Sequence, residues 1–99
     1  MTLTLQNQLK LLHDLLDEQL IYKTGDIYEF TQIKKLVQAI MTHKPIQDTD
    51  LFNYLPEIYH YGIEGEKIQC DKEHISSKEY DIIIWKRAIA KSSISSLIY

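Results

Sequence analysis

The chain has 99 residues, a formal net charge of −3 and a single cysteine, Cys70. This length suits one domain, residues 1–99, with a core of its own. The acidic balance argues against a nucleic-acid backbone binder, because phosphate contacts need clustered Lys and Arg. One cysteine allows no intrachain disulfide and fits a reducing, cytoplasmic setting. The chain lacks a signal-peptide pattern at its start, and no run approaches the roughly 18 apolar residues that span a membrane.

The first predicted helix runs from about Thr4 to about Ile21. Leucines recur along it at helical spacing, and there are more of them than one partner helix needs. We therefore expect a core face with a dimer contact beside it, and Leu11 and Leu15 are the candidates for that contact. The core face consists of Leu5, Leu9, Leu12, Leu16 and Leu20. Gly25 follows in a short connection, where we expect it to take a positive φ.

The stretch Gly25 to Met41 predicts the best-defined helix of the chain. Asp26 and Glu29 have the spacing of a capping box, and both carboxylates stand at the positive end of the helix dipole. The apolar positions that follow lie on one wide face, which predicts contact with at least two neighbouring helices. Those positions are Phe30, Ile33, Leu36, Val37, Ile40 and Met41. Pro45 ends this helix.

A third helix is predicted around Leu51 to Tyr61, and Pro56 leaves two alternatives for it. Either the helix is kinked at Pro56, or it starts late with Asn53 as its cap and Pro56 in its first turn. Gly62 is expected to end it. Three tyrosines lie close together in this segment and are candidates for an interaction surface, because hydroxyl-bearing aromatics suit half-buried boundaries. They are Tyr54, Tyr59 and Tyr61.

The last part of the chain begins with a polar connection, Gly62 to Asp71. Ser76 and Glu79 then form a second capping-box pattern, which predicts a helix through Lys91. The three consecutive isoleucines 82–84 favour a strand as the alternative, but the cap and the residues that follow favour a helix. Residues 92–99 are a frayed turn or a docking tail, in which Leu97 and Ile98 are candidate contact residues.

Catalytic motifs are absent from the sequence: it has no glycine-rich phosphate loop, no nucleophile elbow, no HExxH and no CxxC. Cys70 and His74 are four residues apart and could share a helix face. With His60 they would make a three-ligand metal site, although one cysteine alone is a weak basis for zinc. A small-molecule or metal-binding domain using the Tyr54–His74 region is therefore the alternative to a protein-interaction module.

Several segments, in this order, resemble the YtzH-like family of short bacterial proteins from Bacillus-type organisms. They are LKLLHDLL in the first helix, YEFTQIKKLVQAIM in the second, LPEIYHYGIEG in the third and EHISS before the last. The resemblance implies a cytoplasmic bacterial protein and brings no catalytic or binding motif with it. Pro56 and the serine-rich end depart from the family's pattern.

Together these patterns predict an all-α fold, a small antiparallel helical bundle of three to four helices. The predicted function is that of a non-enzymatic protein-interaction or regulatory module, with a protein partner or a second copy of itself. We expect no catalytic residues, no metal, no cofactor, no nucleic acid and no membrane contact.

Overall fold

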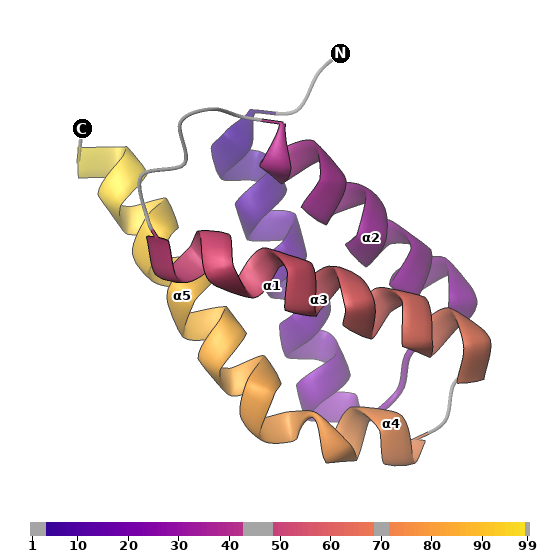
Figure 1. Cartoon of the computed structure of the whole chain (residues 1–99). Helices are drawn as coiled ribbons and strands as arrows, with labels where there is room; N and C mark the ends of the chain where they lie inside the picture. The colour runs from indigo at the N-terminus through magenta and orange to yellow at the C-terminus, as the bar shows by residue number, and fades with distance from the viewer. Residues whose placement is uncertain (1–3, 43–48, 69–71, 99) are drawn as a thin grey trace.

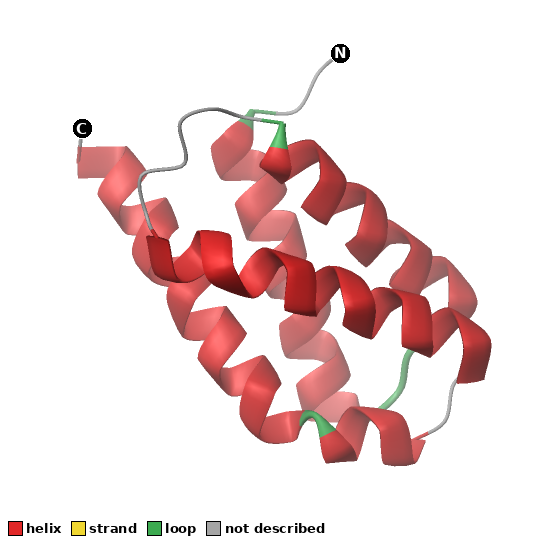
Figure 2. Cartoon of the chain, in the orientation of Figure 1, coloured by secondary structure: helices red, strands yellow, loops and turns green. Residues whose placement is uncertain are grey.

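Five α-helices make up the part of the chain that the computed structural model describes, which is residues 4–42, 49–68 and 72–98. For residues 49, 50, 68, 72 and 92–98 only the backbone is described. No strand occurs within these ranges (Figure 2), so the all-α class is confirmed. The helices are α1 (Leu5–Tyr22), α2 (Ile27–Met41), α3 (Thr49–Ile68), α4 (Lys72–Ser77) and α5 (Glu79–Ile98).

The arrangement differs from a simple antiparallel bundle of three to four helices. In Figure 1, α1 runs opposite to both α2 and α5, whereas α3 passes obliquely in front of α1 and lies beside α2. The predicted last helix corresponds to α5, and a short additional helix, α4, precedes it. The predicted helix count is therefore too low, and the fully antiparallel arrangement is not confirmed.

Side-chain caps set the starts of α1 and α2, and the cap at Asp26 is the one that the sequence predicts. Thr4 Oγ1 accepts from the backbone N–H of Asn7 at 3.1 Å, and Asp26 Oδ1 accepts from that of Glu29 at 2.8 Å. These bonds satisfy amide groups that the first turn of a helix leaves without a partner. The left-handed residue after α1 is Lys23, at φ 56°, so the predicted positive φ of Gly25 is wrong. Helix α2 ends at Met41, and Pro45, the predicted cause of the helix end, lies outside the described residues.

Gly25 is required because the turn between α1 and α2 leaves no room for a side chain at this position. A Cβ at this position would lie 2.6 Å from Gln19 Nε2 and 3.2 Å from the Phe30 ring. The turn between α1 and α2 therefore passes close over side chains of both helices, and a larger residue would push them apart.

Helix α3 continues through Gly62, so the expected helix end at this glycine and the polar connection after it are wrong. Pro56 lies inside the helix, which also rules out a start at Asn53. Gly62 and Gly65 face α2, where a Cβ would lie 2.7 Å from Lys34 Cγ and 2.1 Å from Phe30 Cδ1, respectively. The two glycines let the helices approach closely.

A polar contact also joins α2 to α3. Glu66 accepts from Thr31 Oγ1 at 2.5 Å and from Lys34 Nζ at 2.7 Å. The Lys34 ammonium and the Thr31 hydroxyl hold the pKa of the Glu66 carboxyl below its ordinary value. The carboxylate in turn raises the pKa of Lys34.

The predicted cap at Ser76 is wrong, because Ser76 lies within α4. Ser77 Oγ donates to the His74 carbonyl at 2.8 Å, and the Lys78 carbonyl accepts from the Ile82 N–H at 2.8 Å. Lys78 is thus the residue at which the chain leaves α4 and starts α5. The side chain of Ile75 is fully buried and anchors α4 to the core.

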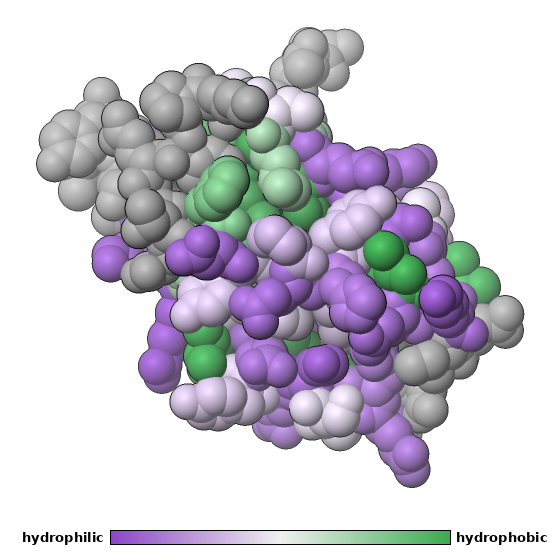
Figure 3. Space-filling view, viewed as in Figure 1, coloured by the Kyte–Doolittle hydropathy of each residue, from purple (hydrophilic) through white to green (hydrophobic). Residues whose placement is uncertain are grey.

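The core combines side chains from all five helices. The predicted core faces of α1 and α2 are confirmed at five positions, since Leu9, Leu12, Leu16, Phe30 and Ile33 are all buried. Other buried members come from later helices: Leu51, Leu55, Ile58, Tyr61, Ile75, Ile82, Trp85 and Ile89. The face in Figure 3 is mostly hydrophilic, with a hydrophobic area beside the start of α3. Among the described helices, none combines the length and the apolar character that crossing a membrane requires.

Candidate functional site

A groove of about 420 Å³ lies between α3 and α5. Its volume falls within the range of small-ligand or side-chain pockets. The lining residues are Pro56, Glu57, His60, Tyr61 and Glu64 from α3, Lys78 from the α4–α5 turn, and Asp81 and Trp85 from α5. We call this the α3–α5 groove.

The α3 wall is polar because Glu57, His60 and Glu64 recur at helical spacing on one face. His60 Nε2 and Glu64 Oε1 are 2.7 Å apart, and the His60 side chain is 69% exposed. The other oxygen of Glu64 lies 3.9 Å from Nδ1 of His74, whose side chain is almost completely buried. Glu64 therefore stands between an exposed and a buried imidazole.

The groove floor is aromatic. The Tyr61 ring stacks on His74, with centroids 4.9 Å apart and planes 17° apart, and lies 5.6 Å from Trp85. Phe30 approaches Tyr61 edge-on at 5.5 Å. Such ring pairs add to the stability that area burial alone provides. The floor is therefore a fixed part of the core.

Beneath the floor, a buried polar pair joins α1 to α3. Tyr61 donates its hydroxyl hydrogen to Gln19 Oε1 at 2.7 Å, and the Gln19 side chain is fully buried. Within the described residues, Gln19 Nε2 has no hydrogen-bond partner. Burial raises the pKa of the Tyr61 phenol far above its ordinary value, so Tyr61 is a hydrogen-bond donor at every physiological pH. The sequence gives no sign of this pair, because residues 19 and 61 meet only in the fold.

The candidate contact residues of the sequence are not brought together in one surface. Leu11 is exposed, Leu15 and Tyr54 are half-buried beside the core, and Tyr61 belongs to the core itself. Tyr61 thus offers a partner almost no surface, although it supports the groove. The half-buried Tyr59 accepts from Gln38 Nε2 at 3.2 Å. The side chains of Leu97 and Ile98 lie outside the described residues, and their contacts stay a prediction.

The predicted metal ligands are not assembled in the described part of the chain. Cys70 lies outside it, His60 is exposed, and His74 is stacked in the core. Among the described residues, no group of three His, Cys, Asp or Glu side chains could hold a metal ion. His74 is in this structure a packing residue of the aromatic floor.

A second surface stands out at the end of the bundle where α1 turns into α2 and α5 begins. Five large apolar or aromatic side chains are exposed there, and we call them the α1–α2 end: Ile21, Tyr22, Ile27, Tyr28 and Tyr80. An ion pair of 3.3 Å between Lys23 and Glu79 ties the turn to the start of α5. None of these residues is among the contact candidates predicted from the sequence, because local spacing does not show which neighbours cover a helix end.

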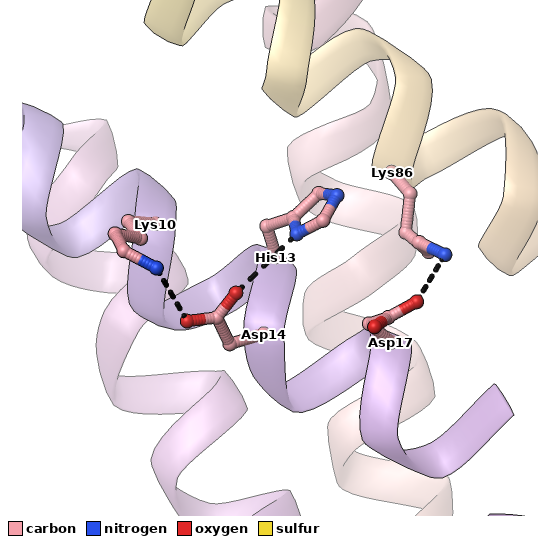
Figure 4. A network of polar contacts seen from close by, with 5 residues as sticks. All are labelled: Lys10, His13, Asp14, Asp17 and Lys86. Atoms are coloured by element: carbon pink, nitrogen blue, oxygen red, sulfur yellow. Dashed lines mark hydrogen bonds and ion pairs between the residues drawn. The ribbon is translucent and has the colours of Figure 1, made fainter. Parts of the chain in front are cut away.

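Charged side chains along α1 form short-range pairs, and one of them reaches α5 (Figure 4). Lys10 and Asp14 lie 3.0 Å apart, and His13 Nδ1 lies 3.5 Å from the same carboxylate. The Lys10 ammonium lowers the pKa of Asp14. Asp17 pairs with Lys86 of α5. Of these contacts, the one between Asp17 and Lys86 joins α1 to α5.

Comparison with known proteins gives one family. The sequence model described as YtzH-like protein matches residues 3–89. A relative named "Uncharacterized protein YtzH", from Bacillus subtilis (strain 168), is 24% identical over 85 residues. The aligned part covers 86% of this chain and 91% of that relative. No solved structure matches the chain.

Proposed function

The chain belongs to the YtzH-like protein family, and we propose that this member is a non-enzymatic protein-interaction module of the cytoplasm. Its partner is another protein or a second copy of the chain. The resemblance stated from the sequence is confirmed by the family match, but the match itself assigns no activity. The proposal therefore depends on the surface of the molecule.

The observation that carries the proposal is the exposure of the α1–α2 end. Tyr22, Tyr28 and Tyr80 are 68%, 70% and 75% exposed, and Ile21 is 62% exposed. Aromatic residues are enriched in protein interfaces, where tyrosine supplies both apolar area and a hydrogen-bonding hydroxyl. The same side chains contribute little to the core, so burial on folding does not explain them.

Self-association is the part of this proposal that can be tested first. Leu11 is 43% exposed on α1 and provides a second apolar point of contact. Sedimentation velocity at micromolar concentration should show a dimer that Tyr22→Ser combined with Tyr28→Ser weakens. Leu11→Glu separates a contact through the α1 face from one through the α1–α2 end.

A strictly monomeric chain would reject self-association and leave a different protein as the partner. A pull-down from the native cell, with the Tyr22→Ser, Tyr28→Ser variant as the control, then decides the rest. A protein retained by the wild type and lost by this variant supports the proposal. Equal retention of every protein by both forms would reject the α1–α2 end as the contact surface.

A small-molecule site in the Tyr54–His74 region is the second hypothesis. It is supported by the α3–α5 groove, because this region supplies the α3 wall and Tyr61. Native mass spectrometry with elemental analysis tests it on the purified chain. The absence of any bound species, together with unchanged thermal unfolding across metals and common metabolites, would remove it.

A further inference from the structure

We propose that the α3–α5 groove binds a basic peptide segment, with an arginine or lysine seated between Glu57 and Asp81. The inference rests on the proposed role as a protein-interaction module. It uses a different surface from the α1–α2 end, however, so that either contact can fail without the other. Three properties of the groove support the proposed binding of a basic segment: its charge, its apolar lining and its size.

The charge of the groove is the first support. Three carboxylates line it, from Glu57, Glu64 and Asp81, against one lysine, Lys78, and the imidazole of His60. Glu64 is already paired with His60. Within the described residues, neither Glu57 nor Asp81 forms an ion pair, and the two come from opposite walls. A cation between them would have a carboxylate on each side.

The apolar lining explains why the cation should belong to a side chain with an apolar stem. Trp85 and Tyr61 close the base of the groove, but they are only 3% and 1% exposed and offer almost no ring surface to a ligand. Pro56 also lines the groove and is exposed, so its ring provides apolar surface on which the methylene groups of lysine or arginine can pack.

The size of the groove restricts the class of ligand. About 420 Å³ accommodates one or two side chains, but not a folded element. A bare metal ion does not fit the described residues, which contain no group of three potential ligands. An anionic ligand such as a nucleic acid would meet the carboxylates. A short basic segment of a partner protein satisfies all of these conditions.

Trp85 provides the measurement, because it is the single tryptophan of the chain. The probe is a capped six-residue peptide with two arginines and a central leucine, and its counterpart carries glutamate in place of arginine. Titration of the full chain should shift the indole N–H resonance of Trp85 and the amides of the groove. The glutamate peptide should leave them unchanged. Binding should weaken as salt is added, because exposed charges are screened.

The key variant is Glu57→Gln combined with Asp81→Asn. Its matched control is Asp14→Asn combined with Glu18→Gln, which changes the net charge equally on α1, outside the groove lining. The groove variant should lose roughly fivefold or more in peptide affinity, since each exposed ion pair contributes roughly two- to fivefold. The control should bind as the wild type does. Circular dichroism and thermal unfolding establish that both variants fold.

Three results would overturn the inference. The first is an unchanged Trp85 resonance at millimolar arginine peptide. The second is equal loss of affinity in the groove variant and the α1 control, which would show attraction by net charge only. The third is binding of spermidine as tight as that of the peptide, which would make the groove a site for free amines. None of these results depends on contacts at the α1–α2 end, so the proposed function is judged separately.

Discussion

Replacing Gly65 by alanine is the sharpest test of how α3 packs on α2. An alanine Cβ at this position would lie 2.1, 2.3 and 2.4 Å from the Cδ1, Cε1 and Cγ atoms of Phe30. Ordinary carbon contacts are about 3.5–4 Å, so three ring atoms overlap with the new methyl group by more than about 1 Å. Phe30 cannot simply turn away, because it is buried against Tyr61 and His74.

Two opposing contributions set the size of the effect. Overpacking of a core costs about 1–3 kcal/mol, and this contact belongs at the upper end of that range. Alanine in place of glycine inside a helix returns about 1 kcal/mol. We therefore expect Gly65→Ala to lower the free energy of unfolding by about 1–2 kcal/mol, which is about 5–10 °C in the melting temperature of a chain of this size.

Urea unfolding, followed by Trp85 fluorescence and circular dichroism, measures this change. The control is the same substitution in a Phe30→Ala background, in which Cγ and the ring are gone. There Gly65→Ala should be neutral or stabilising by up to about 1 kcal/mol, because only the helix propensity remains. If Gly65→Ala is as stable as the wild type while Phe30 is present, Gly65 does not pack on Phe30 and the α2–α3 contact described here is incorrect.

Three further substitutions test other contacts by urea unfolding. Tyr61→Phe should destabilise the fold by about 1–3 kcal/mol, because the buried Gln19 amide then loses its remaining partner. An unchanged stability would contradict the buried pair. Asp26→Ala should cost about 1 kcal/mol through loss of the α2 cap, whereas Asp26→Asn should retain most of it. Glu66→Gln should be less stable than the wild type at pH 7, and the difference should shrink as the pH falls below about 4.5, since the Lys34 ion pair lowers the folded-state pKa of Glu66. A difference independent of pH would reject the ion pair as its cause.

The first two helices could be predicted from the sequence because their limits and faces depend on local chemistry. Thr4 and Asp26 cap by bonding amides three residues away, and the apolar spacing of each helix fixes which side is buried. For these elements the tertiary structure agrees with the local preference.

The third helix could not be predicted to its full length, because its glycines serve a distant neighbour. A glycine such as Gly62 is typical of a helix end. In the fold, however, Gly62 lies beside Lys34 of α2, and Gly65 lies beside Phe30. Contact with α2 outweighs the low helix propensity of glycine. The close approach depends on residues some thirty positions earlier, which no local pattern contains.

For the candidate functional residues too, local chemistry was predictable from the sequence, whereas their surroundings depend on the fold. Tyr61 and His74 were noticed for their chemistry, but the fold uses both as aromatic packing beneath the groove. The placement of Glu57 and Asp81 on opposite walls of one groove, and the hydrogen bond between Tyr61 and Gln19 beneath it, require the packing of α3 against α1 and α5. The exposed tyrosines of the α1–α2 end were missed because exposure depends on which neighbours cover a helix end.

The central claim is that the α1–α2 end is a protein-contact surface, and site-specific photo-crosslinking in the native cell tests it most directly. A photoreactive phenylalanine analogue replaces Tyr28 or Tyr80, and the control position is Asn53, which is exposed on α3. We predict a discrete crosslinked product from positions 28 and 80, identified by mass spectrometry as one partner protein or a second copy of the chain, and none from position 53. Crosslinks that are absent at positions 28 and 80, or equally abundant and diverse at all three positions, would contradict the claim.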